Sequence, residues 1–134
     1  MEHRPEKPPN LTKNQTLVME VLSSAGGPLR AYAILDQLRG KGFRAPLQVY
    51  RALDKLSDRG MVHRIESMNA FIACRHLYNN SHGTVGFTIC ETCGEVAEIF
   101  DGAFHEGLNN LAKTIGFTQK KSTFELIGHC KHCG

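Results

Sequence analysis

Hydrophobic residues recur at helical spacing in three segments of the N-terminal half of the chain. The first segment follows Thr12, which forms a capping-box pattern with Gln15. The second covers about residues 30–39, and the third opens at Pro46 and ends at Gly60. The pattern therefore predicts three short amphipathic helices. Their apolar faces consist of Leu17, Val18, Val21 and Leu22, then Ala31, Ile34, Leu35 and Leu38, then Val49, Ala52, Leu53 and Leu56.

After the third segment the pattern changes to short β-type runs. Residues 61–65 and 70–74 predict two strands joined by a tight connection. Three helices followed by a β-hairpin make up a winged helix, which is a common DNA-binding arrangement. Farther along, the pattern predicts strands at 84–89, 95–100 and 123–127, and an amphipathic helix at 104–115 that carries Leu108, Leu111 and Ile115.

The predicted fold class is α+β, with two domains. Residues 1–77 would form an N-terminal winged-helix DNA-binding domain that begins with a proline-bearing tail. The polar, turn-rich residues 78–84 would form a hinge, and residues 85–134 a small α/β dimerisation domain. So short a sheet buries little by itself, and its open edges favour pairing with a second copy. The sequence thus predicts a homodimer.

The composition is that of an ordinary globular protein, but the charge is unevenly distributed. The 134 residues are 41% apolar and carry a formal net charge of +3. Residues 1–75 hold 12 Lys and Arg against 7 Asp and Glu, whereas residues 76–134 hold 4 against 6. The basic half favours a polyanion as partner. No apolar run approaches the ~20 residues that span a bilayer, so we expect a cytoplasmic protein without a membrane partner.

The third predicted helix presents a polar face suited to DNA. Gln48, Arg51 and Lys55 project from the side opposite the apolar face, and Tyr50 lies at the boundary. Arginine can bond guanine in a bidentate manner, glutamine can address adenine or phosphate, tyrosine can contact a thymine methyl or a phosphate, and lysine can neutralise phosphate charge. Arg64 on the first hairpin strand would lie near phosphates. The alternative is an ordinary solvated helix face.

Four of the five cysteines form two C-x-x-C pairs, Cys90 with Cys93 and Cys130 with Cys133. Two such pairs can surround one tetrahedral ion with four thiolates, which favours a structural zinc site. The 36 residues between the pairs exceed the needs of a compact zinc ribbon and leave room for a strand, a helix and a second strand. Disulfides or a redox-active C-x-x-C are the alternatives, although no signal peptide or βαβ pattern accompanies the first pair.

A second set of side chains with metal-binding groups is spread along the chain. It contains His63 on the first hairpin strand, Cys74 at the end of the second, His82 in the hinge and Glu98 on a C-terminal strand. Imidazole, thiolate and carboxylate together suit tetrahedral Zn²⁺. Spacing alone leaves packed or solvated side chains as the alternative. Cys74 is, however, the one cysteine outside the two pairs.

Several motifs carry a resemblance that extends over nearly the whole chain. They are V-Y-R-A-L-D-K-L at 49–56, V-H-R-I-E-S at 62–67, C-R-H-L at 74–77, F-T-I-C-E-T-C-G at 87–94 and the terminal G-H-C-K-H-C. With these motifs the chain resembles the ferric uptake regulator superfamily, and within it the zinc uptake regulator branch. The resemblance implies a dimeric, zinc-responsive repressor of zinc-import genes that binds two Zn²⁺ per subunit and a palindromic operator in double-stranded DNA.

The resemblance also implies roles for individual residues. The cysteines of the two pairs would hold a structural zinc ion, and the second set a regulatory one. Tyr32, Tyr50 and Arg51 match family positions that touch DNA, with Arg51 reading bases. The iron-sensing branch carries His-His-Asp-His where residues 84–87 read Thr-Val-Gly-Phe, and a further histidine at the position of Ser122. These departures favour zinc over iron or peroxide as the signal.

The positions of the second set predict a mechanism. Ligands on the hairpin, the hinge and the dimerisation domain would tie each DNA-binding domain to the dimer, so that zinc selects a geometry with recognition helices about 34 Å apart. The alternatives are an iron or peroxide sensor of the same fold, a zinc-storage protein and a zinc enzyme. A catalytic zinc usually keeps an open position, and four candidate ligands leave none. We therefore expect no catalytic activity and no small-molecule substrate.

Overall fold

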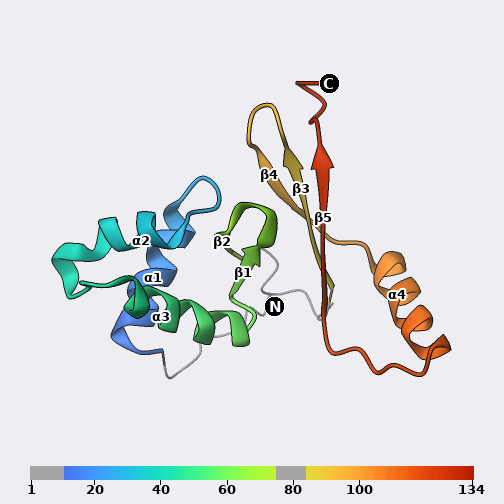
Figure 1. Cartoon of the computed structure of the whole chain (residues 1–134), viewed down its shortest axis with the longest axis horizontal. Coiled ribbons are helices and arrows are strands. Elements are labelled where there is room, and N and C mark those ends of the chain that lie inside the picture. Colours follow the sequence, from blue (N-terminus) through green and yellow to red (C-terminus); the bar gives the residue numbers. More distant parts are fainter. Residues whose placement is uncertain (1–10, 75–83) are drawn as a thin grey trace, which may run out of the picture. The chain divides into compact units, whose positions relative to one another are not determined.

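The structure is a computed structural model of the chain, and it describes residues 11–74 and 84–134. The chain divides into two compact units, Met1–Tyr78 and Asn79–Gly134 (Figure 1). In the described residues the first unit contains three α-helices and a β-hairpin, and the second a three-stranded sheet with one helix. This arrangement confirms the α+β class and the winged helix that the sequence predicts.

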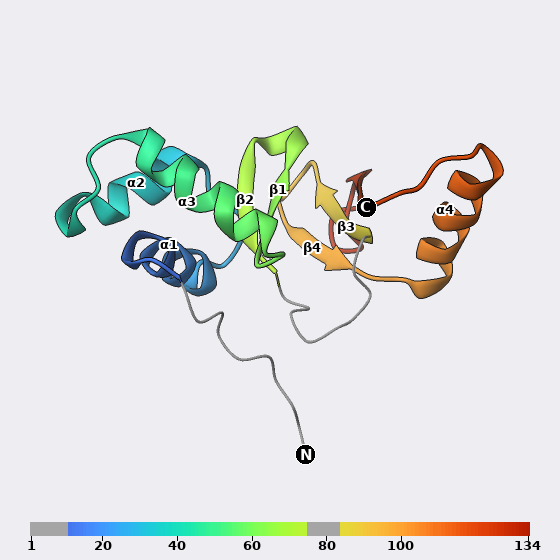
Figure 2. The same ribbon diagram turned by 90° about the horizontal axis from the view of Figure 1, so that it is seen from below.

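The body of the first unit is formed by the helices α1 Lys13–Ser24, α2 Ala31–Leu38 and α3 Pro46–Asp58 (Figures 1 and 2). The predicted capping box is present, because the Thr12 hydroxyl accepts from the Gln15 amide and the Gln15 side chain accepts from the Thr12 amide, each at 3.1 Å. A 3₁₀ turn, η1 Arg39–Lys41, follows α2. All the predicted apolar positions of α2 and α3 are buried, as are Val18 and Leu22 of α1.

A β-hairpin completes the first unit, with β1 Val62–Ile65, the 3₁₀ turn η2 Glu66–Met68 and β2 Ala70–Ala73. The two strands pair in antiparallel register. Asn69 closes the turn with a φ of 50°, a left-handed conformation that asparagine tolerates better than most residues. Leu29, just before α2, exchanges two backbone hydrogen bonds of 2.9 and 2.8 Å with Phe71. These bonds join the hairpin to the helical body.

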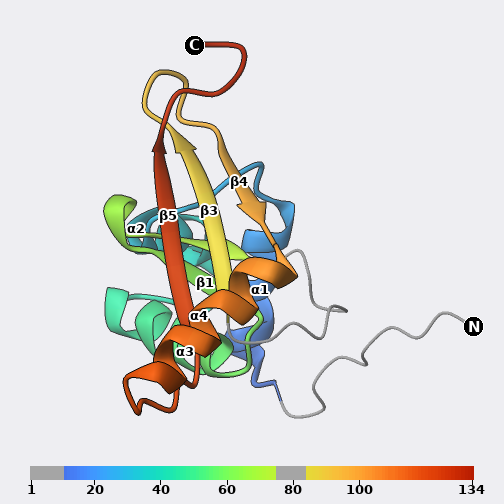
Figure 3. The ribbon, with the colours of Figure 1, turned by 90° about the vertical axis from the view of Figure 1, so that its right-hand side faces the viewer.

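The second unit is a sheet with the strand order β4-β3-β5. Its elements are β3 Thr84–Cys90, β4 Val96–Ile99, α4 Gly102–Thr114 and β5 Ser122–Gly128. β3 pairs antiparallel with β4 and parallel with β5. Parallel strands need a crossover connection, which α4 provides. The helix lies to one side of the sheet, toward the end remote from the C-terminus (Figures 1 and 3).

Two local features fix the position of α4. Asp101 caps the helix by accepting from the amides of Ala103 at 2.9 Å and Phe104 at 3.4 Å, so the helix begins two residues before the predicted start. The Phe124 ring of β5 then meets Phe104 edge-on, with 4.7 Å between the ring centroids. The same ring covers Gly86 of β3, where an added Cβ would lie 2.1 Å from a ring atom. Phe124 therefore fills the space that a side chain at position 86 would need.

The second unit leaves many large apolar side chains exposed. They are Phe100, Phe104, Leu111, Ile115, Phe117, Leu126 and Ile127. Leu111 and Ile115, which the sequence pattern put on the apolar face of the helix, are 59% and 70% exposed, whereas Ala112 is the residue that α4 buries. Exposed apolar surface of this extent is typical of an interaction face. Among the residues that the structure describes, no helix is long and apolar enough to cross a membrane.

Candidate metal centre and nucleic-acid interface

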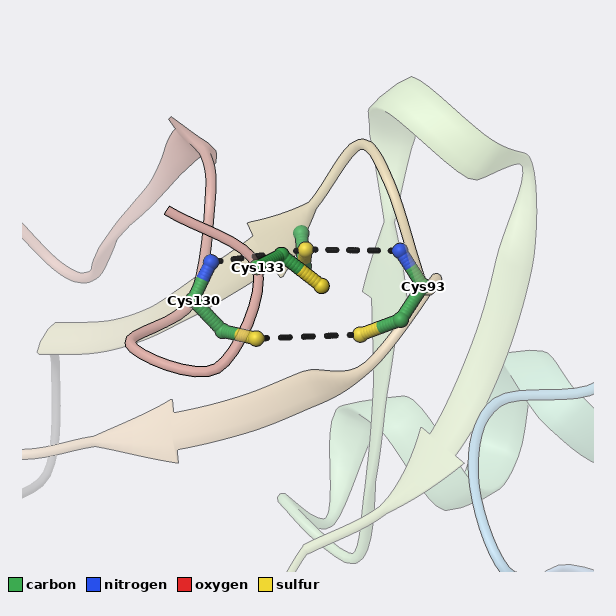
Figure 4. Close-up of side chains that lie close together, drawn as sticks. Cys93, Cys130 and Cys133 are labelled. Carbon is green, nitrogen blue, oxygen red and sulfur yellow. Dashed lines mark hydrogen bonds between the residues drawn. The ribbon is translucent and has the colours of Figure 1, made fainter.

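The two C-x-x-C pairs meet at one end of the sheet. Cys90 and Cys93 lie where β3 turns into β4, and Cys130 and Cys133 follow β5. β3 and β5 are parallel neighbours with Cys90 opposite Gly128, so both cysteine pairs follow the same end of these two strands. The four sulfur atoms lie within 4.8 Å of one another (Figure 4). Strand pairing thus brings together two motifs that are far apart in the sequence.

Backbone amides point at Cys90, the buried member of the four. The amides of Cys93 and Cys130 each donate to the Cys90 sulfur at 3.4 Å (Figure 4). Gly94 continues the first turn with a φ of 80°, and its amide donates to the Cys90 carbonyl at 2.9 Å. In the second turn the Gly134 amide donates to the Cys130 carbonyl at 2.8 Å. Both turns therefore hold their thiols in the manner of metal-binding knuckles.

The sulfur geometry fits a tetrahedral zinc ion. A Zn–S bond of about 2.3 Å implies about 3.8 Å between ligand sulfurs. The sulfurs of Cys93 and Cys130 are 3.8 Å apart (Figure 4). The four cysteines of the two pairs form no disulfide bonds in the structure. Four soft thiolates form a closed shell without a position for water or substrate, which suits a structural ion and not a catalytic one.

The thiols of this cluster differ in acidity. Hydrogen bonds from the amide of Cys93, and next from that of Cys130, stabilise the Cys90 thiolate and lower the pKa of Cys90 from 9.0 to about 5. The side-chain hydrogen bond with Cys130 is the main cause that raises the pKa of Cys133 to about 12. At neutral pH Cys90 is therefore deprotonated before a metal ion arrives, whereas Cys133 loses its proton on binding.

A further hydrogen bond connects the two cysteine turns outside the thiols. The Thr92 hydroxyl lies 3.0 Å from Nδ1 of His129, the residue that precedes Cys130. The hydroxyl donates when the imidazole carries its proton on Nε2. The sequence alone does not distinguish His129 from an ordinary surface histidine. Its one distinguishing feature is that it stands directly before Cys130, between β5 and the second cysteine pair. In the structure the hydrogen bond between His129 and Thr92 holds the two cysteine turns together.

The candidate DNA-contacting side chains belong to α2 and α3 of the first unit. Arg51 and Lys55 are exposed one turn apart on α3. Tyr50 is 36% exposed, and its ring packs edge-on against Phe71 of β2 with 6.3 Å between the centroids. That contact fixes the direction of the phenol. Tyr32 on α2 is 62% exposed.

Two other candidates are engaged within the first unit. The Gln48 side-chain oxygen accepts from the Ala45 amide at 3.0 Å, and its nitrogen donates to the Gly42 carbonyl at 3.3 Å. Arg64 donates to the side-chain oxygen of Asn69 at 2.8 Å. Gln48 therefore stabilises the start of α3, and Arg64 stabilises the hairpin turn. Sequence pattern alone indicates neither contact, because both depend on how the preceding or following turn folds.

Residues 9–127 match the sequence profile of the Ferric uptake regulator family. The chain belongs to this family. It is 36% identical over 124 residues to the zinc uptake regulation protein of Escherichia coli strain K12, a match that covers 92% of this chain and 72% of that protein. The zinc uptake regulation protein of Mycobacterium tuberculosis strain H37Rv is 24% identical over 123 residues, which cover 91% of this chain and 92% of that one.

Solved structures of family members agree with these sequence matches. The crystal structure of holo XcZur has 39% sequence identity and a TM-score of 0.80, and the match covers 92% of this chain and 85% of that one. A zinc uptake regulator complexed with zinc and DNA has 34% identity and a TM-score of 0.82, with 92% and 82% covered. Ferric uptake regulators at about 20% identity share the fold, such as that of Helicobacter pylori with a TM-score of 0.60.

Three of the four residues predicted to form a second metal-binding set lie among the described residues, two in the first unit and one in the second. In the first unit, His63 and Cys74 offer ligand atoms within 4.8 Å of each other. The amide of Cys74 donates to the Met61 carbonyl at 2.9 Å, which fixes the chain just after β2. Glu98 is half-buried on β4 of the second unit. His82 lies outside the described residues, so the assembly of all four stays a prediction.

The positions at which the resemblance places ligands of the iron-sensing branch, residues 84–87 and 122, hold other chemistry here. The buried hydroxyl of Thr84 forms hydrogen bonds with Nδ1 of His105 on α4 and, at 2.9 Å, with the Ser122 hydroxyl. The Phe124 ring occupies the space next to Gly86. Two neutral hydroxyls and one imidazole form a much weaker metal site than thiolates or several imidazoles. His105 was not predicted at this place, because its position depends on how α4 packs on the sheet.

Proposed function

We propose that this chain is a zinc-responsive, DNA-binding repressor of zinc-uptake genes. The observation that carries the proposal is the joint match to zinc uptake regulation proteins and to a regulator solved with zinc and DNA, at 36% and 34% identity. The cluster of four thiols and the exposed basic face of α3 supply the chemistry that such a regulator needs. The proposal includes no catalytic step.

In this proposal Cys90, Cys93, Cys130 and Cys133 hold a structural zinc ion. Their support is the sulfur spacing and the two knuckle turns described above. The ion would join the ends of β3 and β5, which are the central strand and one edge strand of the sheet. A zinc ion in a closed thiolate shell contributes directly to folding. It would therefore maintain the second unit without reporting on zinc supply.

A second zinc ion per subunit would be the signal, held by His63, Cys74, His82 and Glu98. Imidazole, thiolate and carboxylate are suitable ligands for tetrahedral zinc, and the first two already offer ligand atoms close together in the first unit. Since the ligands come from both halves of the chain, binding would couple zinc to the geometry of the DNA-binding unit. A coupling of about 1–3 kcal/mol changes DNA affinity roughly 5- to 150-fold.

DNA binding would use the outer face of α3. Arg51 would read a base in the major groove and Lys55 would neutralise a phosphate. Tyr50 and Tyr32 would contact the DNA backbone or a base edge next to them. The amide of Gln48 is used at the start of α3, so we assign it the positioning of the helix. Arg64 would reach phosphates from the hairpin, where Asn69 holds it.

The second unit would form a homodimer. The proposal of a dimer is supported by the exposed apolar surface on α4 and β5 and by the two edge strands of the sheet, β4 and β5. A twofold dimer repeats its recognition helices and therefore favours a palindromic operator with half-sites about 34 Å apart.

The test is DNA binding at buffered free Zn²⁺. Duplexes are first selected from a random pool with zinc-saturated protein, and the selected duplex is then titrated across a wide range of free zinc, with Fe²⁺ and Mn²⁺ in parallel. The proposal expects a palindromic product and a steep gain of affinity with zinc on protein whose thiol cluster is already filled. Affinity that does not change with zinc would show a storage protein or scaffold, and a stronger response to iron would show a sensor of the iron type.

Variants separate the two metal sites in the same assay. Glu98→Ala is expected to retain the thiol-bound zinc and lose the zinc response, since it removes a ligand of the second set alone. Glu95→Ala, which changes an exposed acidic residue just before β4, is the matched control and should respond as the unaltered protein does. Full operator affinity of Glu98→Ala at saturating zinc would refute a regulatory role for Glu98.

A further inference from the structure

Leu47 is an exposed apolar side chain at the start of the helix proposed to read DNA. It is the second residue of α3 and is 57% exposed, whereas Val49, Ala52, Leu53 and Leu56 of the same helix are buried. Single exposed leucines are common on protein surfaces and need no special role. The position of Leu47 relative to its neighbours on α3 is what distinguishes it.

Leu47, Arg51 and Lys55 form one row along the outside of α3. Residues four apart on a helix are surface neighbours, so these three side chains follow one another over two turns, and all three are exposed. Four residues advance the helix by about 6 Å. Base pairs along DNA are about 3.4 Å apart, so neighbours in this row address positions about two base steps apart.

Gln48, the residue after Leu47, is not available for base contacts at this end of the helix. Gln48 uses both ends of its amide, at 3.0 Å from the Ala45 amide nitrogen and 3.3 Å from the Gly42 carbonyl. In a helix-turn-helix module the N-terminal residues of the recognition helix come closest to the base edges. A short side chain such as leucine can reach a base only there, whereas arginine spans a longer gap. Leu47 is therefore the apolar side chain at the deepest part of the proposed interface.

We infer that Leu47 is a specificity-determining residue that contacts the 5-methyl group of a thymine, within about two base pairs of the base read by Arg51. The inference rests on the proposed DNA-binding function and extends it to one base position. Thymine is the only DNA base that offers an apolar group in the major groove, and leucine is the only large apolar side chain in this exposed row. Discrimination against uracil at this position would come from the methyl group alone.

The test uses the duplex selected from a random pool with zinc-saturated, full-length protein. Each thymine is replaced in turn by deoxyuridine, which removes only the methyl group. Burial of one methyl group is expected to change affinity about 4-fold per half-site, and about 15-fold when both symmetric positions are changed. Arg51→Ala, measured on base-substituted duplexes, identifies the pair that Arg51 reads. Leu47→Ala should lose the thymine preference at one position near this pair, and Leu47→Met, which keeps an apolar side chain, should retain it.

The outcomes are distinct. A selected site without a uracil-sensitive thymine within about two base pairs of the Arg51 position overturns the inference while DNA recognition stands. A sensitive thymine whose effect persists unchanged in Leu47→Ala also overturns it, because another side chain then reads the methyl group. Loss of the preference in Leu47→Ala and its retention in Leu47→Met supports it. If no duplex binds at any zinc concentration, the proposed function fails, and the inference fails with it.

Discussion

Replacing Gly86 with alanine tests how the helix of the second unit is held on its sheet. The new Cβ would lie 2.1, 2.4 and 2.6 Å from three atoms of the Phe124 ring, where ordinary contacts begin at about 3.4 Å. The ring must therefore move, and it loses its edge-on contact with Phe104 at 4.7 Å. Overpacking costs about 1–3 kcal/mol, and an aromatic pair contributes about 0.5–1.5 kcal/mol. We expect a loss of about 2–4 kcal/mol in the stability of this unit.

The assay must report on the second unit alone. The chain has no tryptophan, and the two tyrosines among the described residues, Tyr32 and Tyr50, belong to the first unit, so tyrosine fluorescence reports on that unit. Hydrogen exchange measured by mass spectrometry follows peptides from β3 and β5 instead. A loss of about 2–4 kcal/mol corresponds to exchange roughly 30- to 1,000-fold faster in these peptides when opening is fast and reversible. The tyrosine transition in urea should stay unchanged.

Two controls make the result specific. Gly107→Ala is the same change within α4, where an added Cβ meets nothing within 4 Å, and it should slow exchange because alanine favours a helix by up to about 1 kcal/mol over glycine. Phe124→Leu in the Gly86→Ala background removes the clash and should restore part of the protection. Unchanged exchange in Gly86→Ala, or no recovery with Phe124→Leu, would refute the packing argument.

Three further predictions concern the metal centre and the first helix. After dialysis against a chelator that removes the second ion, Cys93→Ser should contain about one zinc ion per chain fewer than the unaltered protein by atomic absorption, and Cys74→Ser should contain the same amount. Equal losses in both variants would contradict the assignment. The pKa of Cys90, held at about 5 by the amide of Cys93 and then that of Cys130, predicts zinc affinity that weakens as pH falls and drops most steeply below about pH 5, where Cys90 takes up a proton as well. A chelator titration measures this, and pH-independent affinity would count against it. Thr12→Ala should lower the free energy of unfolding by about 1 kcal/mol, read from tyrosine fluorescence in urea, whereas Thr12→Ser should not.

The helices and strands follow closely from the sequence because their signals are local. Periodic apolar residues define α2 and α3, and the capping box at Thr12 with Gln15 sets the start of α1. The start of α4 was predicted too late, since Asp101 supplies the cap and the helix opens before its first large apolar residue. The spacing of the cysteine pairs predicts a four-thiolate site, and the structure places the four sulfur atoms within 4.8 Å of one another.

Tertiary contacts lie beyond what periodicity can predict. Gln48 has the helical position of a DNA-contacting residue, but the turn that precedes α3 brings the Gly42 carbonyl within 3.3 Å of its amide. Leu111 and Ile115 have the spacing of a buried face, yet the single chain leaves them exposed. A pattern of apolar residues predicts that a face will be covered, and does not say whether the covering surface belongs to the same chain.

The metal centre and the aromatic contact depend on the same strand pairing. β3 and β5 are parallel, with Gly86 opposite Phe124 and Cys90 opposite Gly128, and these two pairs lie four residues apart, or about 13 Å along the strands. At one end a glycine leaves room for the Phe124 ring, and at the other end this register brings the two cysteine turns together. A shift by one residue would turn every side chain of β5 to the opposite face. Two independent contacts therefore favour a single register for the edge strand β5. This strand must also be regular if a second copy of the chain is to pair with it.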